Sequence, residues 1–235
     1  MTERPPGYVA RCSLRGASAS EDPEDAPIER TIPAALARNT APGVDVPHAP
    51  TDRGSAEPRR RKPRDKPLLI VVTGEGKGKS TAAFGVVIRS VARGWQVSVI
   101  QFMKSGRWQV GEEAVARQLG VDWAATGDGF SWLSDDLERS RALAGAAWRL
   151  AAETIAAGEH HLVVLDEITY PMNWGWISSD EVTAAIRDRP EHVNLIATGR
   201  DAPESLVAVA DTVTEMRKIR HAYDTGVRAK RGIDF

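Results

Sequence analysis

A glycine-rich segment with two lysines and several hydroxyl residues spans Thr73–Thr81 and reads Thr-Gly-Glu-Gly-Lys-Gly-Lys-Ser-Thr. Glycines allow successive backbone N–H groups to converge on one anion, and the N-terminus of a following helix adds a favourable dipole. A lysine supplies a point charge for phosphate oxygens, and the hydroxyl next to it can ligate a divalent metal. The segment therefore predicts a P-loop that binds ATP, or a close relative of it, with Mg²⁺ or Mn²⁺.

Individual residues of this P-loop have different expected tasks. Lys79 is expected to stabilise charge on the phosphates, and Ser80 to ligate the metal. One residue departs from the usual pattern, because Thr73 occupies the position of the first glycine. Glu75 adds a carboxylate that repels phosphate unless it turns toward the ribose hydroxyls. The residues expected to contact the nucleotide are Gly74, Glu75, Gly76, Lys77, Gly78, Lys79, Ser80 and Thr81, together with Arg200, which ends a later strand and either meets phosphate or ribose or pairs with an acid.

Two acids, Asp166 and Glu167, directly follow the apolar run Val163–Leu165. Acids just past the end of a buried strand lie at the carboxyl edge of a sheet, where the ligands of such sheets bind. A carboxylate there can hold Mg²⁺ directly or through water. Because acids end many strands, it is the P-loop upstream that favours a metal-binding role for this pair.

The elements that must position these residues alternate from Pro67 onward. Leu68–Thr73 is a continuous apolar run that ends in the glycine-rich turn, as expected of a buried parallel strand, and Lys79–Arg93 has helical spacing. Strands that alternate with helices predict an α/β fold with a mostly parallel sheet covered by helices on both faces. The later strands are expected at Val97–Met103, Val121–Thr126, His161–Asp166, His192–Thr198 and Thr212–Met216, and the later helices at Glu112–Leu119, Asp135–Ala157, Ser178–Arg187 and Pro203–Val209.

The N-terminal part of the chain has a different composition. Eleven of the 14 prolines lie in residues 1–67, and residues 1–66 hold few large apolar side chains. Such a segment cannot bury enough surface to offset the entropy of ordering, so we expect a disordered, proline-rich extension at 1–66 before one folded domain at 67–235. The basic stretch Arg59–Lys66 is interpreted as a solvated linker, with an arm that folds over an anionic ligand as the alternative.

Composition argues against several functional classes. The net charge is −1, and residues 67–235 hold 19 basic and 22 acidic side chains, so nucleic-acid or membrane binding has no global electrostatic basis. Cys12 is the single cysteine, which excludes an intrachain disulfide and a multi-cysteine zinc site. No apolar run approaches the ~20 residues of a membrane helix, and the N-terminus lacks the apolar region of a secretory signal. We therefore expect a cytoplasmic location.

Six short motifs occur in a specific order: TGEGKGKSTAAFG from Thr73, QFMK at Gln101–Lys104, GFSW at Gly129–Trp132, VVLDEITY at Val163–Tyr170, TGR at Thr198–Arg200 and the terminal GIDF. In this order, the chain from about Pro67 to Phe235 resembles the P-loop class of corrinoid adenosyltransferases. That class includes the ATP:cob(I)alamin and cobyrinic acid a,c-diamide adenosyltransferases. A P-loop alone is shared with many families, whereas the ordered set is far more specific.

The resemblance implies a homodimeric, RecA-like fold and an activity in adenosylcobalamin biosynthesis or salvage. The implied reaction transfers the 5′-deoxyadenosyl group of ATP to the Co(I) centre of a corrinoid and releases triphosphate. Matching positions assign ATP to Gly74–Thr81 and Mg²⁺ to Ser80 and Glu167, with Asp166 as an alternate ligand or a residue behind the metal ligands. At the position of Glu75 the family more often has asparagine.

Two aromatic pairs receive a role only through this resemblance. Phe130 and Trp132 match residues that help to remove the lower axial ligand from cobalt, which makes Co(II) easier to reduce to Co(I); packing is the alternative. An electron-donating flavoprotein is a candidate partner for that reduction. Trp174 and Trp176 are candidates for an apolar wall against the corrin ring, with core or dimer packing as an equal alternative.

The chemistry of such a transfer fits the available side chains. Co(I) is itself a strong nucleophile, so what remains is to position C5′ and to stabilise charge on the leaving triphosphate, for which Lys77 and Lys79 are suited. Three other functions stay open at this stage. They are a RecA-like ATP hydrolase in which Glu167 activates water, a nucleotide-gated nucleic-acid-binding protein that uses Arg59–Lys66, and a regulator that binds ATP without turnover.

Overall fold

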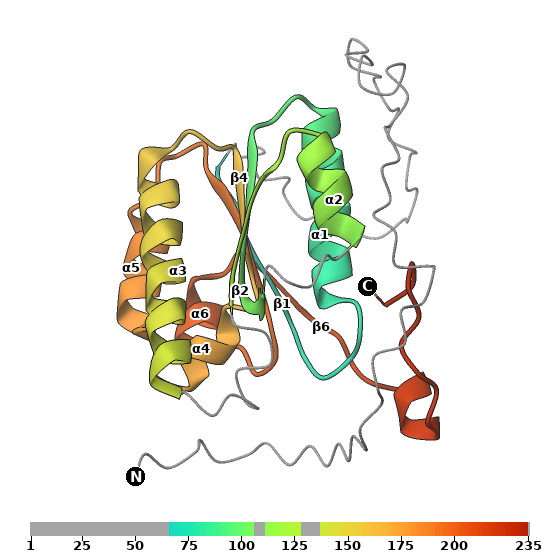
Figure 1. Cartoon of the computed structure of the whole chain (residues 1–235). Coiled ribbons are helices and arrows are strands. Elements are labelled where there is room, and N and C mark those ends of the chain that lie inside the picture. The colour runs from blue at the N-terminus through green and yellow to red at the C-terminus, as the bar shows by residue number, and fades with distance from the viewer. Residues whose placement is uncertain (1–65, 106–110, 128–136, 235) are drawn as a thin grey trace, which may run out of the picture. The chain divides into compact units, whose positions relative to one another are not determined.

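A computed structural model describes residues 66–105, 111–127 and 137–234 (Figure 1). Residues 1–65, and with them nearly all of the expected extension, lie outside the described residues. The elements of the described ranges are β1 Leu69–Thr73, α1 Lys79–Ala92, β2 Val97–Ser105, α2 Gly111–Gln118, β3 Asp122–Gly127, α3 Leu137–Ala157, β4 Leu162–Asp166, α4 Thr169–Asn173, α5 Ser179–Arg187, β5 Asn194–Thr198, α6 Glu204–Val209 and β6 Thr212–Glu215.

The six strands form one sheet in the order β3-β2-β4-β5-β1-β6, and every neighbouring pair is parallel. Helices α1 and α2 cover one face of this sheet, and α3, α4, α5 and α6 cover the other (Figure 1). The predicted α/β class, with a parallel sheet flanked by helices, is therefore confirmed.

The central strands are apolar because both of their faces are buried. In β4 all five residues are buried: Val163 and Leu165 contact the core under α3 and α5, whereas Leu162 and Val164 contact the core under α1 and α2. This alternation follows from the period of two in a strand, which directs successive side chains to opposite faces. The two cores hold the carboxyl ends of the strands at one edge of the sheet.

The predicted elements are all present, with ends that differ by one or two residues. Helix α5 begins one residue after its predicted start, because Ser178 is the cap: its hydroxyl accepts a hydrogen bond from the Glu181 N–H. Helix α4 is an addition that the sequence pattern does not predict. It has only five residues, and Pro171 is tolerated because it lies in the first turn, where its missing N–H has no intrahelical partner to lose.

The described segment after β6, which ends at residue 234, is irregular apart from a 3₁₀ turn at Ala222–Thr225. None of the helices in the described ranges is both long and apolar enough to cross a membrane.

Candidate functional site

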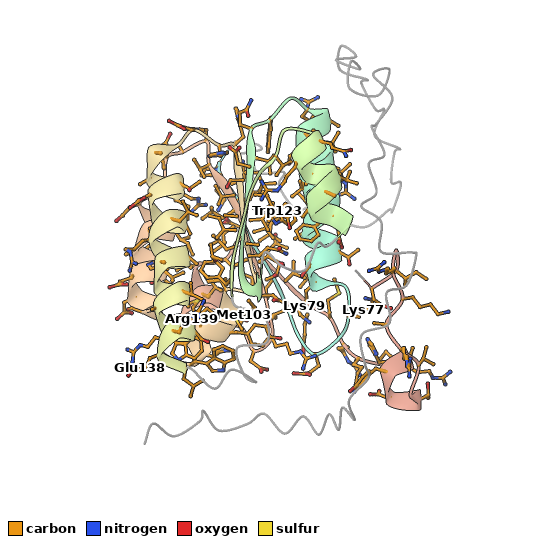
Figure 2. All side chains as sticks on the ribbon, viewed as in Figure 1. Lys77, Lys79, Met103, Trp123, Glu138 and Arg139 are labelled. Atoms are coloured by element: carbon orange, nitrogen blue, oxygen red, sulfur yellow. The ribbon has the colours of Figure 1, made fainter. Side chains whose placement is uncertain are left out.

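The glycine-rich segment has the strand–loop–helix geometry that its sequence predicts. Strand β1 ends at Thr73, the loop turns at Gly78 with φ 114°, and α1 begins at Lys79. The Lys79 ammonium donates hydrogen bonds to the carbonyl oxygens of Gly74 at 2.7 Å and Gly76 at 2.8 Å. Lys77 and Lys79 both lie at the loop end of α1 (Figure 2). The cationic group thus lies inside the curve of the loop, in the place where a polyphosphate would need it.

The loop packs tightly against the backbone that follows β6. The Gly76 N–H donates to the Met216 carbonyl oxygen at 2.6 Å, and the Met216 N–H donates to the Thr73 carbonyl oxygen at 2.8 Å. A Cβ atom on Gly74 or Gly76 would lie 2.6 or 2.7 Å from the Met216 oxygen. These two glycines are therefore required by backbone packing as well as by access to an anion.

Thr73, which replaces the first glycine of the usual motif, has a structural contact of its own. Its hydroxyl oxygen accepts a hydrogen bond from the Ala202 N–H at 3.1 Å. This contact ties the end of β1 to the loop between β5 and α6. The departure therefore leaves the loop geometry intact and adds a link between two segments of the site.

The charges that act on Lys79 identify the side chains around the loop. Burial lowers the pKa of Lys79 below its ordinary value, and the Arg200 charge lowers it further, whereas Glu75, Glu167 and Asp201 act in the opposite direction. The sequence predicts Glu75, Arg200 and Glu167 as nucleotide or metal contacts, and the fold brings all three near one ammonium group.

Arg200 pairs with an acid, and that acid belongs to the P-loop itself. The Arg200 guanidinium lies 3.0 Å from the Glu75 carboxylate. Helix α4 fixes the backbone that carries Arg200, because Thr169 donates its hydroxyl to the Arg200 carbonyl at 2.6 Å and Asn173 donates its amide to the Asp201 carbonyl at 2.9 Å. The repulsion expected from Glu75 is thereby partly compensated, and of the partners that the sequence left open for Arg200 (phosphate, ribose or an acid) the structure shows an acid.

The two acids at the end of β4, Asp166 and Glu167, have different environments. Asp166 is fully buried, and its carboxylate accepts hydrogen bonds from the Gln101 amide at 2.9 Å and from the Thr198 hydroxyl at 2.7 Å. Glu167 is only partly buried and has φ 66°, a conformation that is uncommon for a non-glycine residue. Its N–H donates to the Thr198 hydroxyl oxygen at 2.9 Å. Gln101 and Thr198 belong to the QFMK and TGR motifs, but the sequence pattern alone assigns them no role. Their polar side chains within apolar strands are the signal that could have identified them as site residues.

The donor set fits Mg²⁺. Ser80 in the first turn of α1 and Glu167 after β4 offer oxygen ligands, which Mg²⁺ prefers. Within the described ranges, no group of three or more His, Cys, Asp or Glu side chains could hold a metal ion. In nucleotide sites Mg²⁺ keeps several waters and is held by one or two carboxylates together with phosphates.

Lys77 points to a contact that the sequence does not reveal. Its ammonium lies 2.8 Å from the carboxylate of Asp234, in the terminal GIDF motif. Two hydrogen bonds lower the pKa of Asp234: the larger effect comes from the Lys77 ammonium and the smaller from the Lys230 N–H. The neighbouring residues Gly232 and Ile233 border an apolar cavity of about 560 Å³ that is also lined by α1 and α2. The C-terminal turn thus contacts the P-loop.

The aromatic candidates divide into two groups. Phe130 and Trp132 lie outside the described residues. Trp174 and Trp176 are partly buried with ring centroids 4.6 Å apart, and both pack against the core beneath α4. This packing favours the structural interpretation of the second pair.

Comparisons with known proteins match the chain to one family of enzymes. The family model for the ATP:corrinoid adenosyltransferases BtuR/CobO/CobP matches residues 65–235. A corrinoid adenosyltransferase of Pseudomonas aeruginosa is 40% identical over 173 residues, which cover 73% of this chain and 85% of that protein. The corrinoid adenosyltransferase CobA of Salmonella typhimurium is 39% identical over 171 residues, which cover 73% of this chain and 87% of that protein. A corrinoid adenosyltransferase of Escherichia coli is 38% identical with the same coverage.

Proposed function

The chain belongs to the ATP:corrinoid adenosyltransferase family, and from this premise we propose how its P-loop end supports adenosyl transfer. It is an enzyme whose substrates are ATP and a corrinoid. In the proposed step, the electron pair of Co(I) attacks C5′ of ATP, a cobalt–carbon bond forms, and the C5′–oxygen bond breaks. The electron pair of the broken bond leaves with inorganic triphosphate. No protein nucleophile and no proton transfer are needed for this balance.

The position of Lys79 is the observation that carries the proposal. Its ammonium is held by two loop carbonyls, and it can exchange these for phosphate oxygens without moving out of the loop. Negative charge builds on the triphosphate as the C5′–oxygen bond breaks, so a partly desolvated cation that is already in place stabilises the transition state more than the ground state. Lys77 and the N–H groups of the loop add to this effect.

Ser80 and Glu167 are the residues that would hold Mg²⁺. Bound with ATP, Mg²⁺ neutralises part of the phosphate charge. Glu167 has a left-handed backbone conformation and its charge acts on Lys79 in the loop, whereas Asp166 is fully buried. We therefore assign Glu167 as the direct ligand and Asp166 as a residue that supports it.

The corrinoid side of the reaction depends on features that remain predictions from the resemblance. Phe130 and Trp132 are proposed to displace the lower axial ligand. A homodimer, a flavoprotein that supplies electrons, and a cytoplasmic location likewise stay predictions. The corrinoid could be cobalamin or cobyrinic acid a,c-diamide, and comparing the transfer rates for these two substrates would decide between them.

The test is incubation with ATP, Mg²⁺ and a chemically reduced corrinoid. We expect a light-sensitive product with the absorption of an alkylated cobalt, and we expect Lys79→Ala to abolish both its formation and the binding of ATP. The variant should keep the unfolding transition of the parent, because within the described ranges the ammonium donates its hydrogen bonds to carbonyls of its own loop. Near-normal transfer by Lys79→Ala would contradict the site assignment.

A further inference from the structure

Four buried side chains form a continuous hydrogen-bonded row across four neighbouring strands. The Trp123 indole N–H on β3 donates to the Gln101 amide oxygen on β2 at 3.2 Å, and the Gln101 amide nitrogen donates to Asp166 on β4 at 2.9 Å. From the other side, the Thr198 hydroxyl on β5 donates to Asp166 at 2.7 Å. The exposed fractions of the four residues are 6%, 1%, 0% and 0% along the row.

The direction of every hydrogen bond in this row is fixed by chemistry. An indole N–H can only donate, so the Gln101 amide oxygen faces Trp123 and its nitrogen faces Asp166. The Thr198 hydroxyl has one proton, which it gives to Asp166, and its oxygen is then able to accept the Glu167 N–H at 2.9 Å. The row therefore ends on the backbone of Glu167.

The end of the row coincides with the unusual backbone of the site. Glu167 has φ 66°, which L residues rarely adopt and which persists only where surrounding contacts enforce it. The hydrogen bond from its N–H to Thr198 is one such contact. Burying a carboxylate costs free energy of desolvation even when it is hydrogen-bonded. Apolar side chains would fill this part of the core without that cost. A purpose beyond packing is indicated.

We propose that Gln101 and Thr198 are positioning residues for the metal: they lock Asp166, and Thr198 in turn holds the backbone of Glu167 so that its carboxylate faces the metal–nucleotide site. The proposal rests on the proposed assignment of Mg²⁺ to Glu167. In this proposal Asp166 supports Glu167 and is not itself the metal ligand, since its side chain is fully buried and its two oxygens accept hydrogen bonds from Gln101 and Thr198. Trp123, which lies between the sheet and α1 (Figure 2), closes the row at its far end.

If Gln101 and Thr198 position the metal ligand, their replacement should weaken the effect of Mg²⁺ on ATP binding and leave ATP binding without metal nearly unchanged. Isothermal titration calorimetry gives the dissociation constant of ATP for the full chain with Mg²⁺ present and again with EDTA. The ratio of the two constants measures how strongly the metal and ATP favour each other's binding. Residues that support metal ligands typically change metal affinity by about 10–100-fold when they are replaced.

Thr198→Val has the same shape without the hydroxyl, and Thr198→Ser retains the hydroxyl. We expect Thr198→Val to reduce the ratio at least about tenfold, while its dissociation constant in EDTA stays within about threefold of the parent. Thr198→Ser should keep the ratio of the parent. Gln101→Leu, which removes both bonds at the other side of Asp166, should reduce it as well and provides a second variant should Thr198→Val fail to fold.

Equal loss of ATP affinity with and without Mg²⁺ would overturn the proposal, since it would reveal a general defect of the fold. An unchanged ratio in Thr198→Val would also overturn it. Glu167→Gln separates the assignment of the metal to Glu167 from the positioning role of Thr198. An unchanged ratio in Glu167→Gln refutes the metal assignment itself, whereas loss in Glu167→Gln with none in Thr198→Val refutes only the positioning role.

Discussion

Replacing Gly76 by alanine would place a methyl group against the backbone that follows β6. The added carbon would lie 2.7 Å from the Met216 carbonyl oxygen and 2.8 Å from the carbonyl carbons of Met216 and Arg217. These neighbours are backbone atoms, which cannot rotate away as the end of a flexible side chain can. Either the loop or the segment after β6 must move by several tenths of an ångström.

The expected loss of stability follows from two contributions. The short hydrogen bond from the Gly76 N–H to Met216 contributes about 1 kcal/mol, and overpacking of this kind costs about 1–3 kcal/mol. We expect Gly76→Ala to lower the free energy of unfolding by about 2–4 kcal/mol. For a domain of this size the melting temperature falls by about 2–4 °C per kcal/mol, which predicts a decrease of roughly 4–16 °C.

Two other glycines provide matched controls. Gly78 has no atom within 4 Å of an added Cβ but has φ 114°, so Gly78→Ala carries only the backbone strain of about 1–2 kcal/mol. Gly85, within α1, has neither a close atom nor a positive φ. Gly85→Ala should therefore stabilise the helix by about 0.5–1 kcal/mol.

Urea unfolding of the full chain, followed by circular dichroism, measures all three variants on one scale. The predicted order of stability is Gly85→Ala, then Gly78→Ala, then Gly76→Ala. Calorimetry with ATP should show weakened binding for Gly76→Ala and Gly78→Ala only. If Gly76→Ala were as stable as Gly85→Ala, the close packing between the P-loop and the segment after β6 would be refuted.

Three further predictions concern charge and the corrinoid. Glu75→Gln should tighten ATP binding about fivefold, the effect of removing about 1 kcal/mol of repulsion near water; weaker binding in calorimetry would instead show that Glu75 contacts the ribose. Hydrogen bonds from Lys66 and the Leu69 N–H lower the pKa of Asp211, so its ionised form stabilises the fold. Asp211→Asn should then cost about 1 kcal/mol at pH 7 in urea unfolding, and the difference should shrink as the pH falls below about 4; a constant difference would exclude this linkage. Phe130→Ala and Trp132→Ala should slow transfer from Co(II) more than from chemically generated Co(I), whereas equal losses would leave only packing.

The parts of the site that the sequence predicts are those encoded locally. An apolar run before a glycine-rich turn and a helical pattern after it are enough to predict the P-loop, because strand, loop and helix are adjacent in the chain. The acids after β4 are predicted for the same reason: the end of an apolar run marks the edge of the sheet. Both features are found where they are expected.

The contacts that the sequence does not predict join residues far apart in the chain. Glu75 meets Arg200, and Lys77 meets Asp234. The row from Trp123 to Thr198 exists only because the strand order is β3-β2-β4-β5. Alternating strands and helices predict a parallel sheet but leave the order of its strands open, so neither these pairs nor the row can be read from periodicity.

Transfer of the adenosyl group with triphosphate as the leaving group is tested most directly by identifying the phosphorus-containing products of the reaction. Wild-type protein, ATP, Mg²⁺ and excess chemically generated Co(I) corrinoid are mixed in the dark, and ³¹P NMR and absorption spectra are recorded together. We expect one inorganic triphosphate for each cobalt–carbon bond formed, with no ADP. Accumulation of ADP and phosphate, or triphosphate release without alkylated cobalt, would contradict a P-loop that holds the triphosphate as the leaving group.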